Sequence, residues 1–231
     1  MSASPDLSLW LQGRDAVIAA ADPAGWRRGE PDYHLSAVVM PAQRTSTFDP
    51  GQLEAVVESL VQVFEMEVSH KTDPATWVSM AVDRFRTRVN GGAWASAADI
   101  AEQGSYNVLI GDSPFYRRED EDFASQHHVF HTALPGGFFW EVLEVLTPPP
   151  AITFRWRHWG DFTGPYKGHA PTGERLEMYG MSVARVDEDL RLTEVEHFYD
   201  PNGFLGRMTG GCPVTGHADR AGHADQVQTA H

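Results

Sequence analysis

Five strand-length segments in the second half of the chain limit its fold more than any other feature. All are rich in aromatic and β-branched residues, and most are bounded by Gly, Pro or Asp; they are Val129 to Leu134, Phe138 to Leu146, Ala151 to Trp159, Arg175 to Val186 and Leu192 to Asp200. Three of the four links are short, Pro135-Gly136-Gly137, Pro148-Pro149-Pro150 and Asp187-Glu188-Asp189. Short links join antiparallel neighbours, so an antiparallel meander is predicted.

The first half has helical periodicity instead. After Asp49-Pro50, which suits an N-cap and a first helical position, apolar residues recur at helical spacing at Leu53, Val56, Val57, Leu60, Val61, Phe64 and Val68. A second helical segment is expected where Trp77, Met80, Ala81 and Phe85 share one face. Ser96 with Asp99 predicts the start of a third helix that runs to about Leu109. A short helix is also expected within Leu7 to Ala21.

Helices followed by strands are typical of an α+β fold, with the helices packed on one face of a curved antiparallel sheet that can enclose a cavity. We expect residues 1–45 to form a wrapping arm, residues 46–208 the folded domain and residues 209–231 a flexible tail rich in Gly, Ala and His. The acidic residues 111–126 are expected to form a solvated loop.

Charge and composition exclude several classes of protein. The formal net charge of −14 disfavours nucleic acid as a partner, and no apolar run is long enough to span a membrane. The amino terminus has no pattern of a secretory signal, and the single cysteine, Cys212, fits a reducing compartment, so a cytoplasmic location is expected. His127, His128 and His131 lack the spacing of a metal site, and neither a metal nor a cofactor is predicted.

Seven motifs are distributed over most of the chain. They are Glu65-Met66-Glu67-Val68-Ser69-His70-Lys71, Val89-Asn90-Gly91-Gly92, Gly104-Ser105-Tyr106-Asn107, Gly137-Phe138-Phe139-Trp140-Glu141-Val142-Leu143-Glu144-Val145, Arg157-His158-Trp159-Gly160, the run from Gly164 to Glu174, and Val195-Glu196-His197-Phe198-Tyr199-Asp200. Together these motifs resemble the pathogen-related proteins of plants and their microbial relatives. These proteins are similar to the SnoaL-like branch of the nuclear-transport-factor-like superfamily, which includes polyketide cyclases, dehydratases and isomerases. The resemblance implies a cone-shaped α+β fold and a homodimer.

Strand alternation selects the candidate catalytic base. Ile152, Phe154, Trp156 and His158 share the face that we expect to line the cavity. His158 would then be a titratable group in an aromatic environment, suited to act as a base. The alternative is a core histidine bonded to a backbone carbonyl. Trp140, Phe154, Trp156 and Met178 are predicted apolar walls, and His169 is predicted to lie at the rim.

Two partners for His158 are proposed from neighbouring strands. Tyr179 could donate a hydrogen bond to a carbonyl or a developing enolate, and Glu196 could point inward as an acid or base while His197 faces out. The alternative for Glu196 is a solvent-facing strand, because Glu194, Glu196 and Asp200 alternate on one face.

Three functions follow as hypotheses. The first is a cofactor-independent lyase or isomerase that acts on a small, largely apolar carbonyl or polyketide-like compound. The second is a protein that binds an apolar metabolite without turnover. The third is a haem-associated protein, because Cys212-Pro213 is a dipeptide found in haem-binding motifs.

Overall fold

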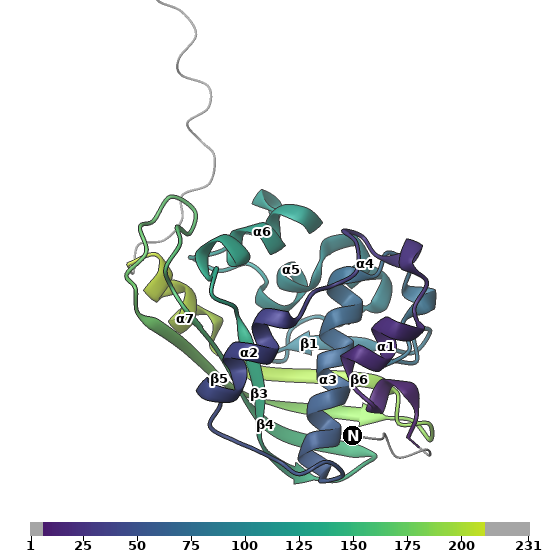
Figure 1. Ribbon diagram of the computed structural model, residues 1–231. Helices are drawn as coiled ribbons and strands as arrows, with labels where there is room; N and C mark the ends of the chain where they lie inside the picture. The colour runs from purple at the N-terminus through teal and green to yellow at the C-terminus, as the bar shows by residue number, and fades with distance from the viewer. Residues whose placement is uncertain (1–6, 211–231) are drawn as a thin grey trace, which may run out of the picture.

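The computed structural model describes residues 7–210, in which helices pack on a six-stranded sheet (Figure 1). The helices are α1 (Arg14–Ala20), α2 (His34–Gln43), α3 (Leu53–His70), α4 (Ala97–Gln103), α5 (Ser105–Ile110), α6 (Phe123–Ala133) and α7 (Pro201–Met208). The strands are β1 (Arg86–Val89), β2 (Ala95–Ser96), β3 (Phe139–Thr147), β4 (Ala151–Asp161), β5 (Arg175–Val186) and β6 (Leu192–Tyr199). The expected α+β class is confirmed.

The sheet has the strand order β2-β1-β6-β5-β4-β3. Four of the five predicted strands are present, and β3 to β6 pair as the predicted antiparallel meander. The expectation of a purely antiparallel sheet is wrong, because β1 runs parallel to β6. A parallel pair needs a long connection between its strands, and here residues 90–191, which include β3, β4 and β5, separate β1 from β6.

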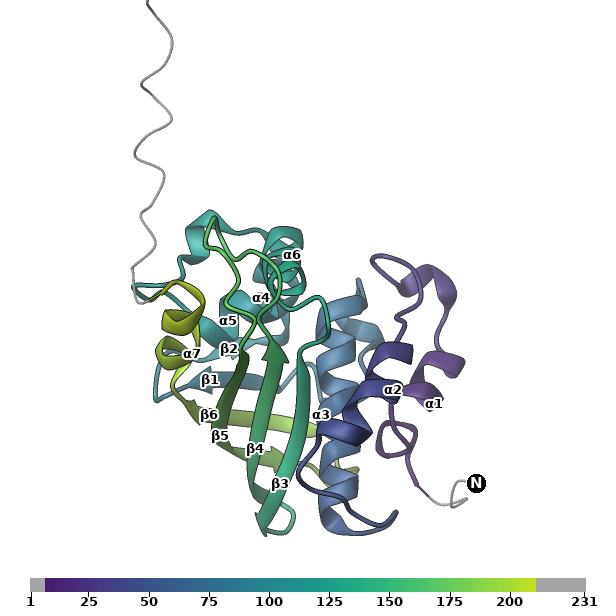
Figure 2. The same ribbon diagram turned by 60° about the vertical axis from the view of Figure 1, so that its left-hand side comes forward.

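The sheet bends around an apolar interior that α3 closes. Figures 1 and 2 show α3 packed along the sheet, and α4, α5 and α6 grouped at one end of the molecule. Val57, Leu60, Phe64 and Val68, four turns of one face of α3, are buried against the sheet. This is the stripe that the helical spacing predicted, and it excludes water from one wall of the interior.

The predicted strand from Val129 to Leu134 is wrong, because residues 129–133 belong to α6 and Leu134 is its C-cap. Asp122 accepts hydrogen bonds from the backbone N–H groups of Ala124 and Ser125 and so caps the helix. Gln126, Phe130 and Ala133 are its buried positions, which is helical rather than alternating spacing. The capping residue outweighs the β propensity of Val129 and Phe130. The expected loop of residues 111–126 therefore ends at Asp122.

The predicted helix around Trp77 to Phe85 is also wrong. Trp77, Met80 and Phe85 are buried as expected, but the backbone there is irregular. The buried carboxylate of Glu67 accepts hydrogen bonds from the backbone N–H groups of Val78 and Ser79 at 2.7 and 2.9 Å. These N–H groups are satisfied by a side chain of α3, so the segment needs no helical hydrogen bonds.

The predicted helix from Ser96 to Leu109 is two helices. Ser96 and Asp99 form the expected capping box of α4, but Gly104 then turns the chain with φ 90° and ψ 153° and starts α5. The first long helix begins later than predicted, since its N-cap is Gln52 and not Asp49. The short helix expected within Leu7 to Ala21 is a 3₁₀ turn followed by α1.

The residues before α3 pack on the outside of that helix, as Figure 2 shows for α1 and α2. Val17 and Trp26 form a small apolar cluster with Val63 and Met66 of α3. The opposite face of the sheet leaves Tyr179 and other apolar side chains of β5 and β6 exposed. No helix within residues 7–210 is long and apolar enough to cross a membrane. The homodimer and the cytoplasmic location stay predictions.

Candidate active site

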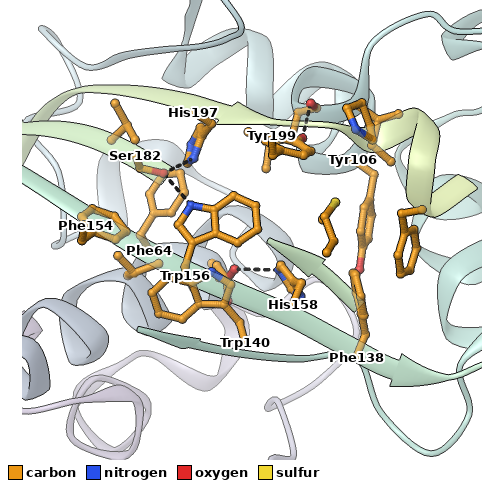
Figure 3. Close-up of a pocket in the computed structure, with 18 of the residues that line it drawn as sticks. Phe64, Tyr106, Phe138, Trp140, Phe154, Trp156, His158, Ser182, His197 and Tyr199 are labelled. Carbon is orange, nitrogen blue, oxygen red and sulfur yellow. Dashed lines mark hydrogen bonds and ion pairs between the residues drawn. The ribbon is translucent and has the colours of Figure 1, made fainter. Parts of the chain in front are cut away.

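The sheet and the helices enclose a cavity of about 110 Å³ between α3, α5, α7 and the inner face of β3 to β6 (Figure 3). This is smaller than the roughly 150 Å³ cavity that holds a benzene molecule, so the space as it stands suits a small apolar group. Its walls are mostly aromatic and aliphatic and include Phe64, Tyr106, Phe138, Trp140, Phe154, Trp156, Met178, Val195, Tyr199 and Phe204. Its polar lining includes Glu65, His158, Ser182 and His197.

Alternation along the strands places each of these side chains. On β4, Phe154, Trp156 and His158 point to the cavity, as the sequence predicted. Trp140 and Met178 also line it. On β5 the register pairs Trp156 with Gly180, whose missing side chain leaves room for the indole, since a Cβ there would lie 2.2 Å from the ring.

Three predicted site residues lie outside the cavity. Tyr179 is on the outer face of β5 with 55% of its surface exposed, because Met178 and Gly180 take the inward positions. Glu196 is also on the outer face, where its carboxylate pairs with Arg88 at 2.8 Å. Its neighbour His197 faces the cavity instead. His169 sits in the loop between β4 and β5, where its backbone bonds to Tyr166.

His158 is held between an aromatic ring and a carboxylate. Its ring stacks on Phe138 with centroids 4.2 Å apart, and its Nε2 lies 3.6 Å from Oε1 of Glu65 on α3. This is an ion-pair distance rather than a hydrogen bond. The nearby carboxylate favours the tautomer with the proton on Nε2. Nδ1 then carries the lone pair, and this atom is buried without a hydrogen-bond partner among the described residues.

His197 is held by a chain of hydrogen bonds across the sheet (Figure 3). The indole N–H of Trp156 donates to Oγ of Ser182 at 2.9 Å, and Oγ lies 2.9 Å from Nδ1 of His197. Because Oγ accepts from the indole, its own hydrogen is free to be donated to Nδ1. His197 then carries its proton on Nε2, which is buried without a hydrogen-bond partner among the described residues.

Burial lowers the pKa of His197 to about 4, and His158 adds a smaller effect in the same direction. His197 is therefore neutral at pH 7, with one N–H to donate. Two side chains that line the cavity thus each have a buried ring nitrogen, a proton acceptor on His158 and a hydrogen-bond donor on His197. A carbonyl compound needs this pair when a proton leaves the carbon beside the carbonyl.

Sequence reasoning missed Glu65, Ser182 and His197. Glu65 lies within the helix, where it reads as a polar surface position, and only the tertiary fold brings it to His158. His197 could have been found, since it alternates with Val195 and Tyr199 on β6, and two apolar neighbours indicate the inward face.

The sequence predicts no metal site at His127, His128 and His131, and its haem hypothesis depends on Cys212-Pro213. Within residues 7–210, no group of three or more His, Cys, Asp or Glu side chains is placed to hold a metal ion. The histidines of α6 are not on a strand, as the sequence interpretation assumed, but on a helix. Cys212-Pro213, on which the haem hypothesis depends, lies outside the described residues.

A relative supplies the family. The pathogen-related protein of Hordeum vulgare is 34% identical over 211 residues, which cover 84% of this chain and 90% of the relative. The chain belongs to the pathogen-related protein family. No family model matches it. The resemblance of its motifs to that family is thereby confirmed.

Solved structures add similarity at a lower level. The candidate SnoaL-like polyketide cyclase of Jannaschia sp. CCS1 is 12% identical, with 73% of this chain and 99% of the other covered and a TM-score of 0.39. IdmH, a candidate polyketide cyclase of Streptomyces antibioticus, is 16% identical, with 65% and 96% covered and a TM-score of 0.40. Similarity at this level assigns neither a reaction nor a ligand to this member of the pathogen-related protein family.

The depressed pKa of His197 predicts a loss of stability in acid. An unfolded histidine titrates near 6.5, so between pH 6.5 and 4 the unfolded chain binds a proton that folded His197 does not. The free energy of unfolding therefore falls as the pH drops through that window, by about 2 kcal/mol from this residue between pH 7.5 and 5. Urea unfolding at the two pH values measures it.

The variant His197→Gln should lose less stability over the same pH interval, because Gln does not titrate. His128→Asn is the matched control, since His128 is exposed on α6 and does not line the cavity. That variant should keep the full dependence of the wild type on pH. If the free energy of unfolding falls equally with pH in His197→Gln and the wild type, His197 is not buried in its neutral form.

Proposed function

We propose that the protein is a cofactor-independent lyase or isomerase that moves a proton on a small, largely apolar carbonyl compound. One observation carries the proposal: two histidines that line a largely apolar cavity have buried ring nitrogens, Nδ1 of His158 and Nε2 of His197, without hydrogen-bond partners among residues 7–210. A buried polar atom without a partner costs about 1–3 kcal/mol, and a ligand with one acidic C–H and one carbonyl oxygen would satisfy both.

Each residue has a separate task in this reaction. His158 Nδ1 takes the proton from the carbon beside the carbonyl, and the carboxylate of Glu65 stabilises the imidazolium that forms. His197 donates its Nε2–H to the carbonyl oxygen as negative charge develops there. The proton then returns from His158 to another carbon in an isomerase, or assists the departure of a β-substituent in a lyase. Ser182 and Trp156 position His197 through their hydrogen bonds.

The proposal is tested by hydrogen exchange at carbon. Small cyclic and aryl ketones are incubated with the protein in D₂O, and loss of the signals from protons beside the carbonyl is followed by NMR. His158→Gln should slow the exchange about 100-fold or more, which is the usual contribution of a positioned base. Glu65→Gln should have a smaller effect in the same direction, because it removes the charge that stabilises the imidazolium and leaves the base in place.

The matched controls come from the outer face of the same sheet. Tyr179→Phe and Glu196→Gln should leave the exchange rate unchanged, because neither residue reaches the cavity. Equal exchange by the wild type and His158→Gln would contradict the catalytic role of His158.

Binding without turnover is the second candidate function, favoured by the largely aromatic and aliphatic walls. It predicts that native mass spectrometry of protein purified from its own host detects a retained apolar compound, while the protein catalyses no exchange at carbon.

A further inference from the structure

A second cavity of about 350 Å³ adjoins the first. Several residues line both spaces: Phe64, Glu65, Tyr106, Leu109, Phe138, Trp140 and His158. Figure 3 shows Tyr106 and Phe138 next to each other beside His158. One molecule could therefore extend from the inner cavity past His158 into the outer one.

The outer cavity differs from the inner one in its polar lining. His127 and His131 lie one turn apart on α6 with stacked rings, 3.8 Å between centroids, and the ring of His70 at the end of α3 is 6.0 Å from that of His127. All three line the outer cavity, together with Arg14. Arg28 lies beside them, with its Nη1 3.1 Å from Nδ1 of His127. We call these three histidines the histidine cluster.

Hydrogen bonds fix which ring nitrogen carries the proton in His127 and in His70. A guanidinium can only donate, so Arg28 donates to Nδ1 of His127, and His127 carries its own proton on Nε2. Nδ1 of His70 lies 3.2 Å from the carbonyl oxygen of Met66 in the preceding turn, so it donates there. Nε2 of His127 is therefore a hydrogen-bond donor, whereas Nε2 of neutral His70 carries a lone pair.

The charged side chains that act on the histidine rings are two guanidinium groups, those of Arg14 and Arg28. Burial lowers the pKa of His127 to about 3 and that of His70 to about 4, and Arg28 and the other histidines add to both effects. The pKa of His131 is lowered by the same causes. The titratable and charged groups that the neighbouring elements bring to the cluster and the cavity around it are Arg14, Arg28, Asp32, Tyr33, Glu65, Tyr106 and His128. Within residues 7–210 the carboxylate at ion-pair distance from a histidine is Glu65, and that histidine is His158.

Such a cluster suits an anion. Two guanidinium groups repel a divalent cation, whereas an anion would be attracted by them and by any proton that the histidines take up. We propose that the histidine cluster with Arg28 binds a carboxylate, and that the ligand is an amphipathic carboxylic acid whose apolar, carbonyl-bearing end lies in the inner cavity. This inference rests on the proposed function, because it assigns the far end of the same ligand.

The test compares carboxylic acids with their amides. Phenylacetate, 3-phenylpropanoate and 4-phenylbutanoate are titrated into the full-length protein beside the matching amides at pH 6, with affinity measured by calorimetry. The amides keep the apolar group and the hydrogen-bonding size but lose the charge. Each acid should bind about tenfold more tightly than its amide, and the difference should be largest for the chain length that spans both cavities.

Variants identify the groups that bind the carboxylate. Arg28→Gln and His127→Asn should each remove most of the difference between acid and amide and leave amide affinity unchanged. His128→Asn, on the same helix but outside both cavities, is the matched control and should preserve the difference. A variant that weakens acid and amide equally would show a structural role and overturn the proposal.

Proton uptake provides an independent readout. A bound carboxylate raises the pKa of the cluster histidines, so binding takes up protons and the affinity for the acids falls as the pH rises from 5.5 to 8. Calorimetry in buffers of different ionisation enthalpy measures this uptake, which should be absent for the amides. If acids and amides bind equally at every pH, the proposal of a carboxylate subsite is wrong, while the apolar cavity is still a ligand site. If no compound of either series binds, the apolar cavity fails as a ligand site, and the inference fails with the proposed function.

Discussion

Replacing Glu141 by Leu is expected to lower the free energy of unfolding by about 3 kcal/mol. The carboxylate is fully buried and accepts hydrogen bonds from the backbone and hydroxyl groups of Thr45 and Ser46. It also pairs at 2.8 Å with Arg157, whose side chain is only 5% exposed. The substitution leaves that guanidinium and three donors short of an acceptor, since the hydroxyl of Ser46 can still donate to the carbonyl oxygen of Val142. Arg157 keeps Glu177 and the carbonyl of Gln43, which limits the loss. Urea unfolding measures it.

Glu144→Leu is the matched control on the same strand. Its carboxylate pairs with Arg155 at 3.3 Å, but both side chains are more than half exposed, and such pairs contribute little to stability. This variant should stay within about 0.5 kcal/mol of the wild type. The double variant with Leu at 141 and Met at 157 should recover part of the loss, because it removes the unpaired charge. Equal stability of Glu141→Leu and Glu144→Leu would contradict the stabilising role of the buried network around Glu141.

The contrast between Glu141 and Glu144 shows where sequence reasoning reaches its limit. Regular alternation puts residues 141, 143 and 145 on one face, but β3 has a bulge between Val142 and Glu144. The bulge brings Glu141 opposite Arg157 and Glu144 opposite Arg155, so two carboxylates three residues apart face the same way. Periodicity predicts which segments are strands, but it does not predict a single inserted residue.

In the candidate site, too, periodicity predicts some positions and not others. Alternation along β4, which has no bulge in its pairing with β5, correctly placed Phe154, Trp156 and His158 at the cavity. The partners of His158 required knowledge of the packing. Glu65 is 93 positions away along the chain, and only the position of α3 on the sheet brings the two side chains to 3.6 Å. Tyr179 was chosen for its chemistry, although Met178, Gly180 and Ser182 on alternate positions already indicated the inward face of β5.

Apolar periodicity also fails to predict the break between α4 and α5 at Gly104. The apolar spacing continues through this residue, but the helix does not. Its φ of 90° and ψ of 153° fall in a region that is essentially restricted to glycine. A Cβ at this position would lie 1.3 Å from Nε2 of buried Gln126, whose Oε1 accepts a hydrogen bond from the backbone N–H of Asn107 at the start of α5. The tertiary contact with α6 therefore depends on the absence of a side chain.

Replacing Gly104 by Ala is expected to lower the free energy of unfolding by about 3 kcal/mol or more, since backbone strain and the displacement of Gln126 add. Gly111→Ala separates the two effects, because Gly111 also ends a helix at positive φ, 69°, but has no atom within 4 Å of an added Cβ. Gly111→Ala should lower the free energy of unfolding by about 1–2 kcal/mol, because it introduces backbone strain without a clash. Combining Gly104→Ala with Gln126→Ala should relieve the clash, because the shorter side chain at 126 leaves room for the new Cβ. The double variant should therefore lose less unfolding free energy than the two single variants lose in sum. Urea unfolding of the wild type, the three single variants and the double variant measures these differences. Equal losses for Gly104→Ala and Gly111→Ala would show that Gln126 moves aside without cost.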